Sequence, residues 1–293
     1  MNELSAHDLP AVLHTIAEVR QWSAAAKERR ERIGFVPTMG ALHEGHLSLV
    51  RASRAECERT IVSIYVNPSQ FAPHEDFGRY PRTLDSDLRQ LAQLADAVFV
   101  PNDAEIYPPG FATWVEPYGA AEPLEGAHRP GHFRGVATVV LKLFQIVGPD
   151  VAYFGQKDFQ QLRVIEQMRD DFHLPVEIRR CPIVREPDGL AMSSRNRYLS
   201  AEGRQKATAL FRALEAARSL VAQGERSAAA IEKAARERLQ SVAGAEIEID
   251  YVALVDPVHL QPVERIVATT LCALAVRIEN TRLIDNAILE PPK

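Results

Sequence analysis

Short apolar runs alternate with amphipathic helical patterns over the first 185 residues, and no other feature of the sequence limits the fold as strongly. Thr60–Val66 (TIVSIYV) is rich in β-branched and aromatic residues, which indicates a strand buried on both faces. Strands that alternate with helices indicate a parallel sheet with helices on both sides. The other predicted strands are Ile33–Val36, Ala97–Val100, Val151–Gly155 and Val176–Val184.

Helical patterns fill the intervals between these runs. Thr83 is a good N-cap for one of them, and Asp85 and Asp87 stand in its first turn, where the helix dipole favours anions. Its apolar residues recur at helical spacing and form one stripe: Leu84, Leu88, Leu91 and Ala95. Further helices are expected at about Gly45–Glu58, at Gly135–Val147 and from near Asp158 onward.

The pattern changes after residue 185. Two alanine-rich helical segments, 200–224 and 227–242, are followed by two strand-like stretches at 246–256 and 265–289. Helices followed by antiparallel strands indicate a separate α+β domain. The sequence therefore predicts an α/β protein with a Rossmann-like parallel-sheet domain at residues 1–185 and a smaller α+β domain at 186–293, joined near Glu186–Gly189.

Composition excludes several classes of function. The formal net charge is -5 and the pI is about 6.0, so a broad surface for a nucleic-acid backbone is not expected. The three cysteines are far apart and form no C-x-x-C pair, which fits a reducing, cytoplasmic compartment better than a disulfide or zinc framework. We expect no signal peptide and no membrane span. An anionic ligand would need a local cluster of cations and backbone amides.

The strongest motif is FVPTMGALHEGHLSLV, in which a strand ends, a glycine-containing turn follows, and a helix begins. A helix N-terminus exposes unpaired amides and a partial positive charge, and so favours phosphate groups. His43 and His46 are three residues apart, which places both rings on one face of the first turn. Gly40 and Gly45 would let phosphate oxygens approach the backbone. The alternative is that both histidines merely cap or pack; a zinc site would need further ligands.

Two later motifs have the same chemistry. In YFGQKDFQQL, Lys157 and Asp158 directly follow a strand, at the sheet edge where α/β proteins bind ligands. In GLAMSSRNRYLS, Ser193, Ser194 and Arg195 form a hydroxyl-rich, cationic turn suited to phosphate. Taken alone, either motif could be ordinary surface, but three phosphate-type signals in this order rarely coincide by chance.

Two glutamines, Gln70 in YVNPSQF and Gln161 in KDFQQL, lie just beyond predicted strand ends. Each could be a plain surface residue. In the predicted crevice, however, a neutral amide would orient a hydroxy acid without weakening its carboxylate as a nucleophile.

The pattern H-x-G-H resembles the signature of HIGH-type nucleotidyltransferases, which cleave ATP between the α- and β-phosphates. The whole set of motifs resembles the pantothenate synthetase (pantoate–β-alanine ligase) family: PTMGALHEGH, YVNPSQF, LEGAHRPGHFRGVATVV, YFGQKDFQQL and GLAMSSRNRYLS. The resemblance implies that pantoate reacts with ATP and Mg²⁺ to give pantoyl adenylate, which β-alanine converts to pantothenate and AMP. It also implies a homodimer and a C-terminal lid domain.

The resemblance also implies roles for single residues. His46 would be the proton donor of the ATP site, Gln70 and Gln161 would contact pantoate, and the metal would be carried by the ATP phosphates. Gln156 stands where the family often has Glu, which directs attention to Asp158 as the nearby acid. The implied nucleotide contacts are Met39, Gly40, Ala41, Leu42, His43, Glu44, Gly45, His46, Gly155, Gln156, Lys157, Asp158, Val184, Met192, Ser193, Ser194 and Arg195.

During catalysis, His43, His46, Lys157 and Arg195 are expected to neutralise charge on the phosphates. The segment 122–135 (EPLEGAHRPGHFRG) is a candidate gate against water, with an ordinary surface loop as the alternative. Other functions stay open. One is a HIGH-type enzyme that transfers AMP to a phosphate-bearing substrate, and another is a non-catalytic adenine-nucleotide sensor.

Overall fold

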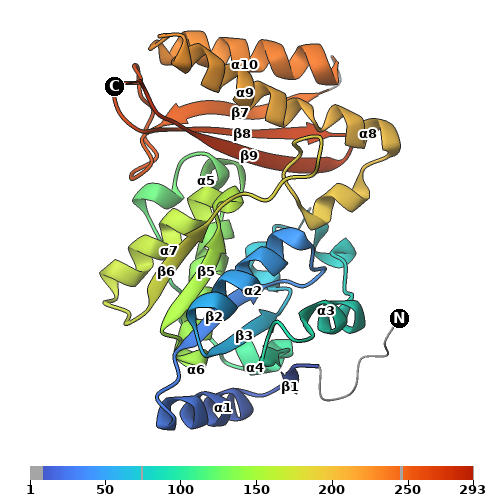
Figure 1. Ribbon diagram of the computed structural model, residues 1–293, viewed down its shortest axis with the longest axis vertical. Helices are drawn as coiled ribbons and strands as arrows, with labels where there is room; N and C mark the ends of the chain where they lie inside the picture. Colours follow the sequence, from blue (N-terminus) through green and yellow to red (C-terminus); the bar gives the residue numbers. More distant parts are fainter. Residues whose placement is uncertain (1–8, 74, 245–246, 293) are drawn as a thin grey trace. The chain divides into compact units, whose positions relative to one another are not determined.

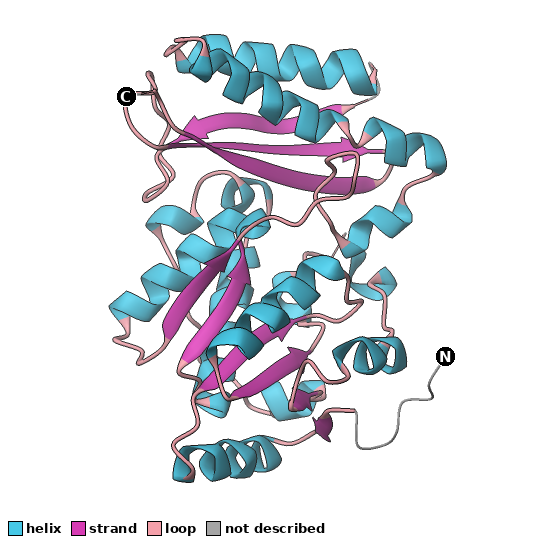
Figure 2. Ribbon diagram, in the orientation of Figure 1, coloured by secondary structure: helices cyan, strands magenta, loops and turns pink. Residues whose placement is uncertain are grey.

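The computed structural model describes residues 9–73, 75–244 and 247–292, which form two compact units (Figures 1 and 2). Unit 1 contains the described residues of 1–121, 129–156 and 161–182. Unit 2 contains those of 122–128, 157–160 and 183–293. Two short pieces of the N-terminal sequence therefore pack with the C-terminal residues. The predicted division into domains at residues 1–185 and 186–293 remains a prediction.

Unit 1 is built on a parallel sheet, as the sequence predicts, and the sheet has six strands, one more than the five predicted. The strand order is β1-β4-β3-β2-β5-β6, so all carboxyl ends lie along one edge. The strands are β1 (Ala11–Leu13), β2 (Ile33–Thr38), β3 (Arg59–Ile64), β4 (Ala97–Phe99), β5 (Val151–Gly155) and β6 (Glu177–Cys181).

Helices cover both faces of this sheet because its strands bury side chains in both directions. Phe35 and Val36 are neighbours on β2, yet they belong to two different apolar clusters. The first cluster includes residues of α1 (Ile16–Glu28), α6 (His132–Val147) and α7 (Phe159–Asp171). The second includes residues of α2 (Glu44–Glu56), while residues of α3 (Leu84–Leu91) supply the predicted leucine stripe. A short helix, α4 (Asp103–Ile106), follows β4.

Unit 2 has a three-stranded antiparallel sheet with α9 (Ala209–Ala222) and α10 (Ala228–Ala243) packed against it (Figure 1). A hairpin of this sheet turns at Glu279 and Asn280, with Ile278 paired to Thr281. The strand-like stretch predicted from 246 begins at a residue outside the described ones. The elements are α5 (Glu125–His128), α8 (Ala201–Lys206), α9 (Ala209–Ala222), α10 (Ala228–Ala243), β7 (Glu248–Val255), β8 (Thr270–Ile278) and β9 (Thr281–Leu289).

The α/β fold class predicted from the sequence is confirmed in both of its parts. The expected linker Glu186–Gly189 is instead a tight turn within unit 2, because Glu186 N–H donates to Leu190 O at 2.8 Å and Arg185 pairs with Ala191 as a β-bridge. Among the described helices, none combines the length and apolar character needed to cross a bilayer.

Candidate functional site

The carboxyl edge of the sheet in unit 1 has a topological switch point between β2 and β5. These strands are neighbours, but the chain continues from β2 toward β3 and β4 on one side, and from β5 toward β6 on the other. Ligands of open α/β sheets bind in the crevice that such a reversal leaves at the strand ends. The loops that follow β2 and β5 carry the first and second predicted motifs.

The loop after β2 is held by a buried carboxylate. Gly40 and Ala41 both have positive φ, of 81° and 51°. Asp87, from the first turn of α3, accepts hydrogen bonds from Ala41 N at 3.0 Å and Leu42 N at 2.9 Å, and is only 1% exposed. From the sequence, Asp87 is predicted only to favour the helix dipole. Its hydrogen bonds to the loop are not predicted, because Ala41 and Leu42 are more than forty positions away.

Thr83 occupies the N-cap position of α3, as the sequence predicts, but its side chain makes no hydrogen bond to the helix backbone. Its hydroxyl lies 3.1 Å from Asp87 Oδ1 and donates to it. A carboxylate that already accepts two backbone N–H groups thus gains a third donor, which fixes its orientation against the loop.

His43 and His46 cap the helix that they introduce. His43 is the N-cap of α2, and its Nδ1 accepts from Gly45 N at 3.1 Å. His46 Nδ1 accepts in turn from His43 N at 3.4 Å, and the two ring centroids are 4.1 Å apart. An Nδ1 that accepts cannot carry the ring proton, so each neutral ring has its N–H at Nε2. The capping that the sequence analysis gave as the alternative role is therefore present. It also leaves the Nε2–H of each ring as a hydrogen-bond donor.

Gln70 lies beside the loop after β2. Its Nε2 donates to Met39 Sδ at 3.1 Å, and its Oε1 accepts from Asn67 Nδ2 at 3.0 Å. Asn67 Oδ1 accepts from the hydroxyls of Ser69 and Tyr107 at 2.8 Å each. Two predicted site residues, Met39 and Gln70, are thus in contact within unit 1. Asn67 belongs to the quoted YVNPSQF motif but was not singled out from the sequence.

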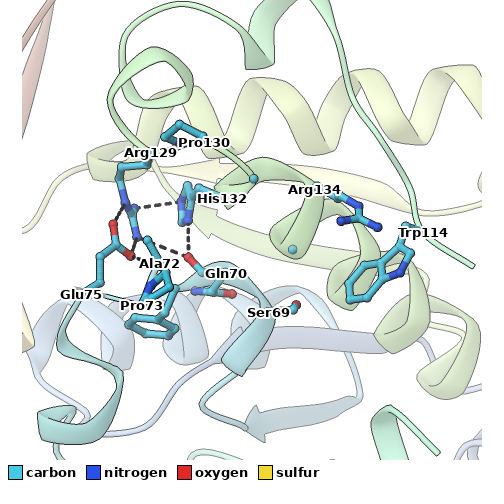
Figure 3. Close-up of a pocket in the computed structure, with 13 residues that line it drawn as sticks. Ser69, Gln70, Ala72, Pro73, Glu75, Trp114, Arg129, Pro130, His132 and Arg134 are labelled. Carbon is cyan, nitrogen blue, oxygen red and sulfur yellow. Dashed lines mark hydrogen bonds and ion pairs between the residues drawn. The ribbon is translucent and has the colours of Figure 1, made fainter. Parts of the chain in front are cut away.

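A cavity of about 270 Å³ lies next to Gln70, between residues 69–73 and Glu75 on one side and the start of α6 on the other (Figure 3). The charged groups in its wall are engaged: Arg129 pairs with Glu75, and Arg134 pairs with Glu116 and stacks over Trp114 at 4.3 Å. Burial would raise the pKa of Glu75, but hydrogen bonds and charge from Arg129 lower it to about 2.

The lysine motif begins as predicted, directly after β5. Gly155 ends the strand, and Gln156–Asp158 form one 3₁₀ turn. Lys157 and Asp158 belong to unit 2, where Lys157 O accepts from Asn286 Nδ2 at 2.9 Å. Lys157 Nζ lies 3.7 Å from Asp158 Oδ1, and their side chains are 20% and 48% exposed. The lysine is thus partly enclosed rather than fully solvated.

The serine–arginine motif follows a compact hairpin in unit 2. Met192 N donates to Val184 O at 3.0 Å, which brings two predicted nucleotide contacts together. Ser193 Oγ accepts from Arg195 N at 3.3 Å and caps the 3₁₀ helix Ser194–Tyr198. Gly189 is needed in the turn, since its φ is 96° and a Cβ there would lie 2.0 Å from the Phe211 ring.

The two glutamines after Asp158 have different surroundings. Gln160 is buried and holds the backbone at 123–125: its Oε1 accepts from Glu125 N, and its Nε2 donates to Pro123 O. Gln161, the predicted substrate contact, is half-buried in the first turn of α7 and belongs to unit 1.

The predicted residues fall into two sets. Unit 1 holds 39–46, Gln70, Gly155, Gln156 and Gln161, whereas unit 2 holds Lys157, Asp158, Val184 and 192–195. Convergence of both sets on one ATP molecule stays a prediction. Across the described part of the chain, no three His, Cys, Asp or Glu side chains gather into a metal-binding group.

Comparison with known proteins agrees with these motifs. The family model described as pantoate-beta-alanine ligase matches residues 11–288. The pantothenate synthetase of Moorella thermoacetica is 55% identical over 281 residues, which cover 95% of this chain and 98% of the relative. That of Thermotoga neapolitana is 51% identical over 95% of this chain and 99% of its own.

Solved structures agree as well. Pantothenate synthetase from Thermus thermophilus has a TM-score of 0.91 and 48% identity, covering 96% of this chain and all of that one. The Francisella tularensis pantoate-beta-alanine ligase, solved with β,γ-ATP and β-alanine, has a TM-score of 0.79 and 34% identity, covering 95% and 97%. This chain therefore belongs to the pantoate–β-alanine ligase family.

Proposed function

We propose that this protein joins pantoate to β-alanine at the expense of ATP, through a pantoyl adenylate. The observation that carries the proposal is the family match over residues 11–288, with the first two phosphate-type motifs in the loops that follow β2 and β5. The Francisella relative, solved with β,γ-ATP and β-alanine, supports both the nucleotide and the amine substrate. ATP is the reactant that the adenylation step requires.

In the first step, the pantoate carboxylate attacks the α-phosphorus, and the bond to the departing pyrophosphate breaks. Charge gathers on phosphate oxygens, and preorganised donors lower the barrier by stabilising it. The Nε2–H groups of His43 and His46 are suited to this, because their Nδ1 atoms accept backbone hydrogens. Lys157 and Arg195 are the proposed cationic donors, and His46 the proposed proton donor.

The backbone around these groups is proposed to bind the nucleotide. Gly40 and Ala41 have positive φ in the loop after β2, and a Cβ added at Gly155 would meet no atom within 4 Å. Residues 39–46, 155–158, 184 and 192–195 are assigned to ATP, and Gln70 and Gln161 to pantoate. In the second step, β-alanine attacks the acyl carbon and AMP departs.

Mg²⁺ is proposed to enter with ATP and to be held chiefly by phosphates and water, as is common for this ion. Asp158 offers a carboxylate whose side chain is 48% exposed, which fits one additional protein ligand. When bound, the ion supplies charge neutralisation on the phosphates. Asp158 is the acidic side chain of the turn Gln156–Asp158.

We also propose a homodimer in the cytoplasm. The location rests on three cysteines that are all unpaired and buried, which suits a reducing compartment. The dimer rests on the family alone and is checked by light scattering of the purified protein.

The deciding experiment is an assay with ATP, pantoate and β-alanine that follows AMP and pantothenate together. We expect the two products in equal amounts, and exchange of pyrophosphate into ATP that requires pantoate. Release of a dinucleotide-like product would favour a different HIGH-type transferase. ATP binding without turnover would favour a nucleotide sensor.

A further inference from the structure

We infer that Glu75, Arg129 and His132 form a positioning clamp that fixes Gln70 in place for pantoate. Arg129 and His132 both contact the main-chain carbonyl of Gln70, and Glu75 holds Arg129 (Figure 3). The inference rests on the proposed role of Gln70 in pantoate binding. It assigns no substrate contact to the clamp itself.

The foundation of the clamp is an Arg–carboxylate pair. Arg129 Nε donates to Glu75 Oε1 at 2.7 Å, and its NH2 group donates to Glu75 Oε2 at 2.8 Å. The two side chains are only 15% and 16% exposed. Parallel, charge-assisted bonds of this kind restrict the guanidinium in both position and plane. The rest of the guanidinium is therefore aimed in a fixed direction.

His132 transmits this restraint to Gln70. Arg129 NH1 lies 3.0 Å from His132 Nε2, and His132 Nδ1 lies 2.9 Å from Gln70 O. A guanidinium can only donate, so Nε2 is the acceptor and the ring proton of neutral His132 is at Nδ1. That N–H is then directed at the Gln70 carbonyl, which NH2 of Arg129 also approaches at 3.5 Å.

Gly135 closes the clamp from the other side. A Cβ built at Gly135 would lie 2.3 Å from Ser69 O and 2.7 Å from Gln70 Cα, so the backbones of α6 and the 68–70 turn are in close contact. Asn67 meanwhile donates to both Gly135 O and Gln70 Oε1, which orients the Gln70 amide. The backbone and the side chain of Gln70 are thus fixed by independent contacts.

The position of Gln70 matters because misplacing a binding group by about 1 Å can cost on the order of 100-fold in rate. Arg129 uses Nε, NH1 and NH2 on Glu75, His132 and Gln70. We therefore assign it a positioning role that acts on the reaction through Gln70.

The test substitutes Arg129→Lys, which keeps the charge but cannot form the bidentate pair. The matched control is Arg59→Lys, since Arg59 binds Glu31 through the same two donors at 2.8 and 3.1 Å but lies at the amino end of β3. We expect Arg129→Lys to lower kcat/KM for pantoate about tenfold or more, with KM for ATP within about twofold. The control should change neither.

A double-mutant cycle with Gln70→Ala tests the mechanism of the clamp. If Arg129 acts through Gln70, adding Arg129→Lys to Gln70→Ala should cause little further loss. His132→Asn should retain more activity than His132→Leu, because an asparagine amide can still donate near the Nδ1 position. Multiplicative losses in the cycle, or a Gln70→Ala variant that behaves as wild type, would overturn the inference.

Hydrogen exchange of the peptide at 66–73 provides a readout independent of activity. Arg129→Lys should speed exchange there in the ligand-free protein, whereas Arg59→Lys should not. Unchanged exchange would refute the clamp even in an active enzyme. A wild-type protein that makes no pantothenate would instead refute the proposed function, and the exchange experiment would still decide on the clamp.

Discussion

At the scale of single residues, substitution of Lys157 should lower activity without lowering stability. Its carbonyl accepts a hydrogen bond from Asn286, and this contact is kept in Lys157→Ala. Loss of one preorganised donor typically lowers a rate roughly 100- to 1000-fold. We expect pantoate-dependent pyrophosphate exchange to fall by that factor while the melting temperature is unchanged. Lys233→Ala, an exposed lysine of α10, is the control. Near-normal exchange in Lys157→Ala would refute its role.

Asp87 is a second residue whose substitution should affect the loop after β2, which we propose binds ATP. In Asp87→Asn, the new NH₂ group faces the N–H of Ala41 or Leu42, so one buried donor loses its acceptor. Such a loss costs about 1–3 kcal/mol, and the loosened loop should raise KM for ATP. Asp85→Asn, in the same turn but exposed, is the control for charge at the helix start. Equal effects of the two variants on KM would contradict the role of Asp87.

Glu75 should contribute to acid sensitivity. Its folded pKa is about 2, below the ordinary value of 4.5, so its stabilisation is complete above about pH 4.5 and is lost as the pH falls toward 2. Calorimetry at pH 5 and pH 3 should therefore show a smaller pH-dependent drop in melting temperature for Glu75→Gln than for wild type. Glu116→Gln, from an exposed pair, should behave as wild type. An identical drop in melting temperature in wild type, Glu75→Gln and Glu116→Gln would show that Glu75 does not contribute to acid sensitivity.

At the scale of elements, predictability followed the strength of the local signal. The buried strands and the leucine stripe of α3 could be predicted because their period reflects burial directly. β1 is three residues long and largely exposed, so it has no such period and is not predicted from the sequence. α1 is also absent from the helices predicted from the sequence. Its Thr15 and Glu18 form a capping box, and their T-x-x-E spacing is a signal that could have predicted it. The helical segment 200–224 is interrupted between α8 and α9.

The contact of α6 with the 68–70 turn leads to a prediction about an element. Alanine normally stabilises a helix relative to glycine by about 1 kcal/mol, but the Cβ of Gly135→Ala would lie 2.3 Å from Ser69 O. We expect Gly135→Ala to lower both the melting temperature and kcat/KM for pantoate. Gly78→Ala, whose Cβ would meet nothing within 4 Å, should leave both unchanged. A stabilised Gly135→Ala variant would disprove the close contact.

At the scale of the whole molecule, the sequence predicts the order of motifs better than the contacts that support them. The spacing of His43 and His46 predicts a helix start, which the structure confirms. The support given by Asp87 to the loop at 40–42, and by His132 to a main-chain carbonyl, leaves no periodic trace in the sequence. The predicted gate at 122–135 likewise divides at residue 128, with 122–128 in unit 2 and 129–135 in unit 1.

This division bears on whether residues 186–293 form a domain by themselves. Glu125, from the first part of the segment, binds Arg282 NH2 at 2.7 Å and accepts from the Tyr251 hydroxyl at 2.6 Å. The Arg282 and Glu125 side chains are 15% and 8% exposed. A buried charge that loses its partner costs about 3–5 kcal/mol. Asp250, which also binds Arg282, would remain in a C-terminal fragment and offset only part of this.

We therefore expect a fragment of residues 183–293 to be less stable than the same residues are in the intact chain. Arg282→Gln should destabilise the intact chain by about 3 kcal/mol or more, because it leaves Glu125 buried without its cation. The same substitution should cost the fragment much less, since Glu125 is absent from it. Urea unfolding of the four proteins measures both effects. Equal costs of Arg282→Gln in fragment and intact chain would mean that Glu125 is dispensable, and that the C-terminal residues fold as an independent domain.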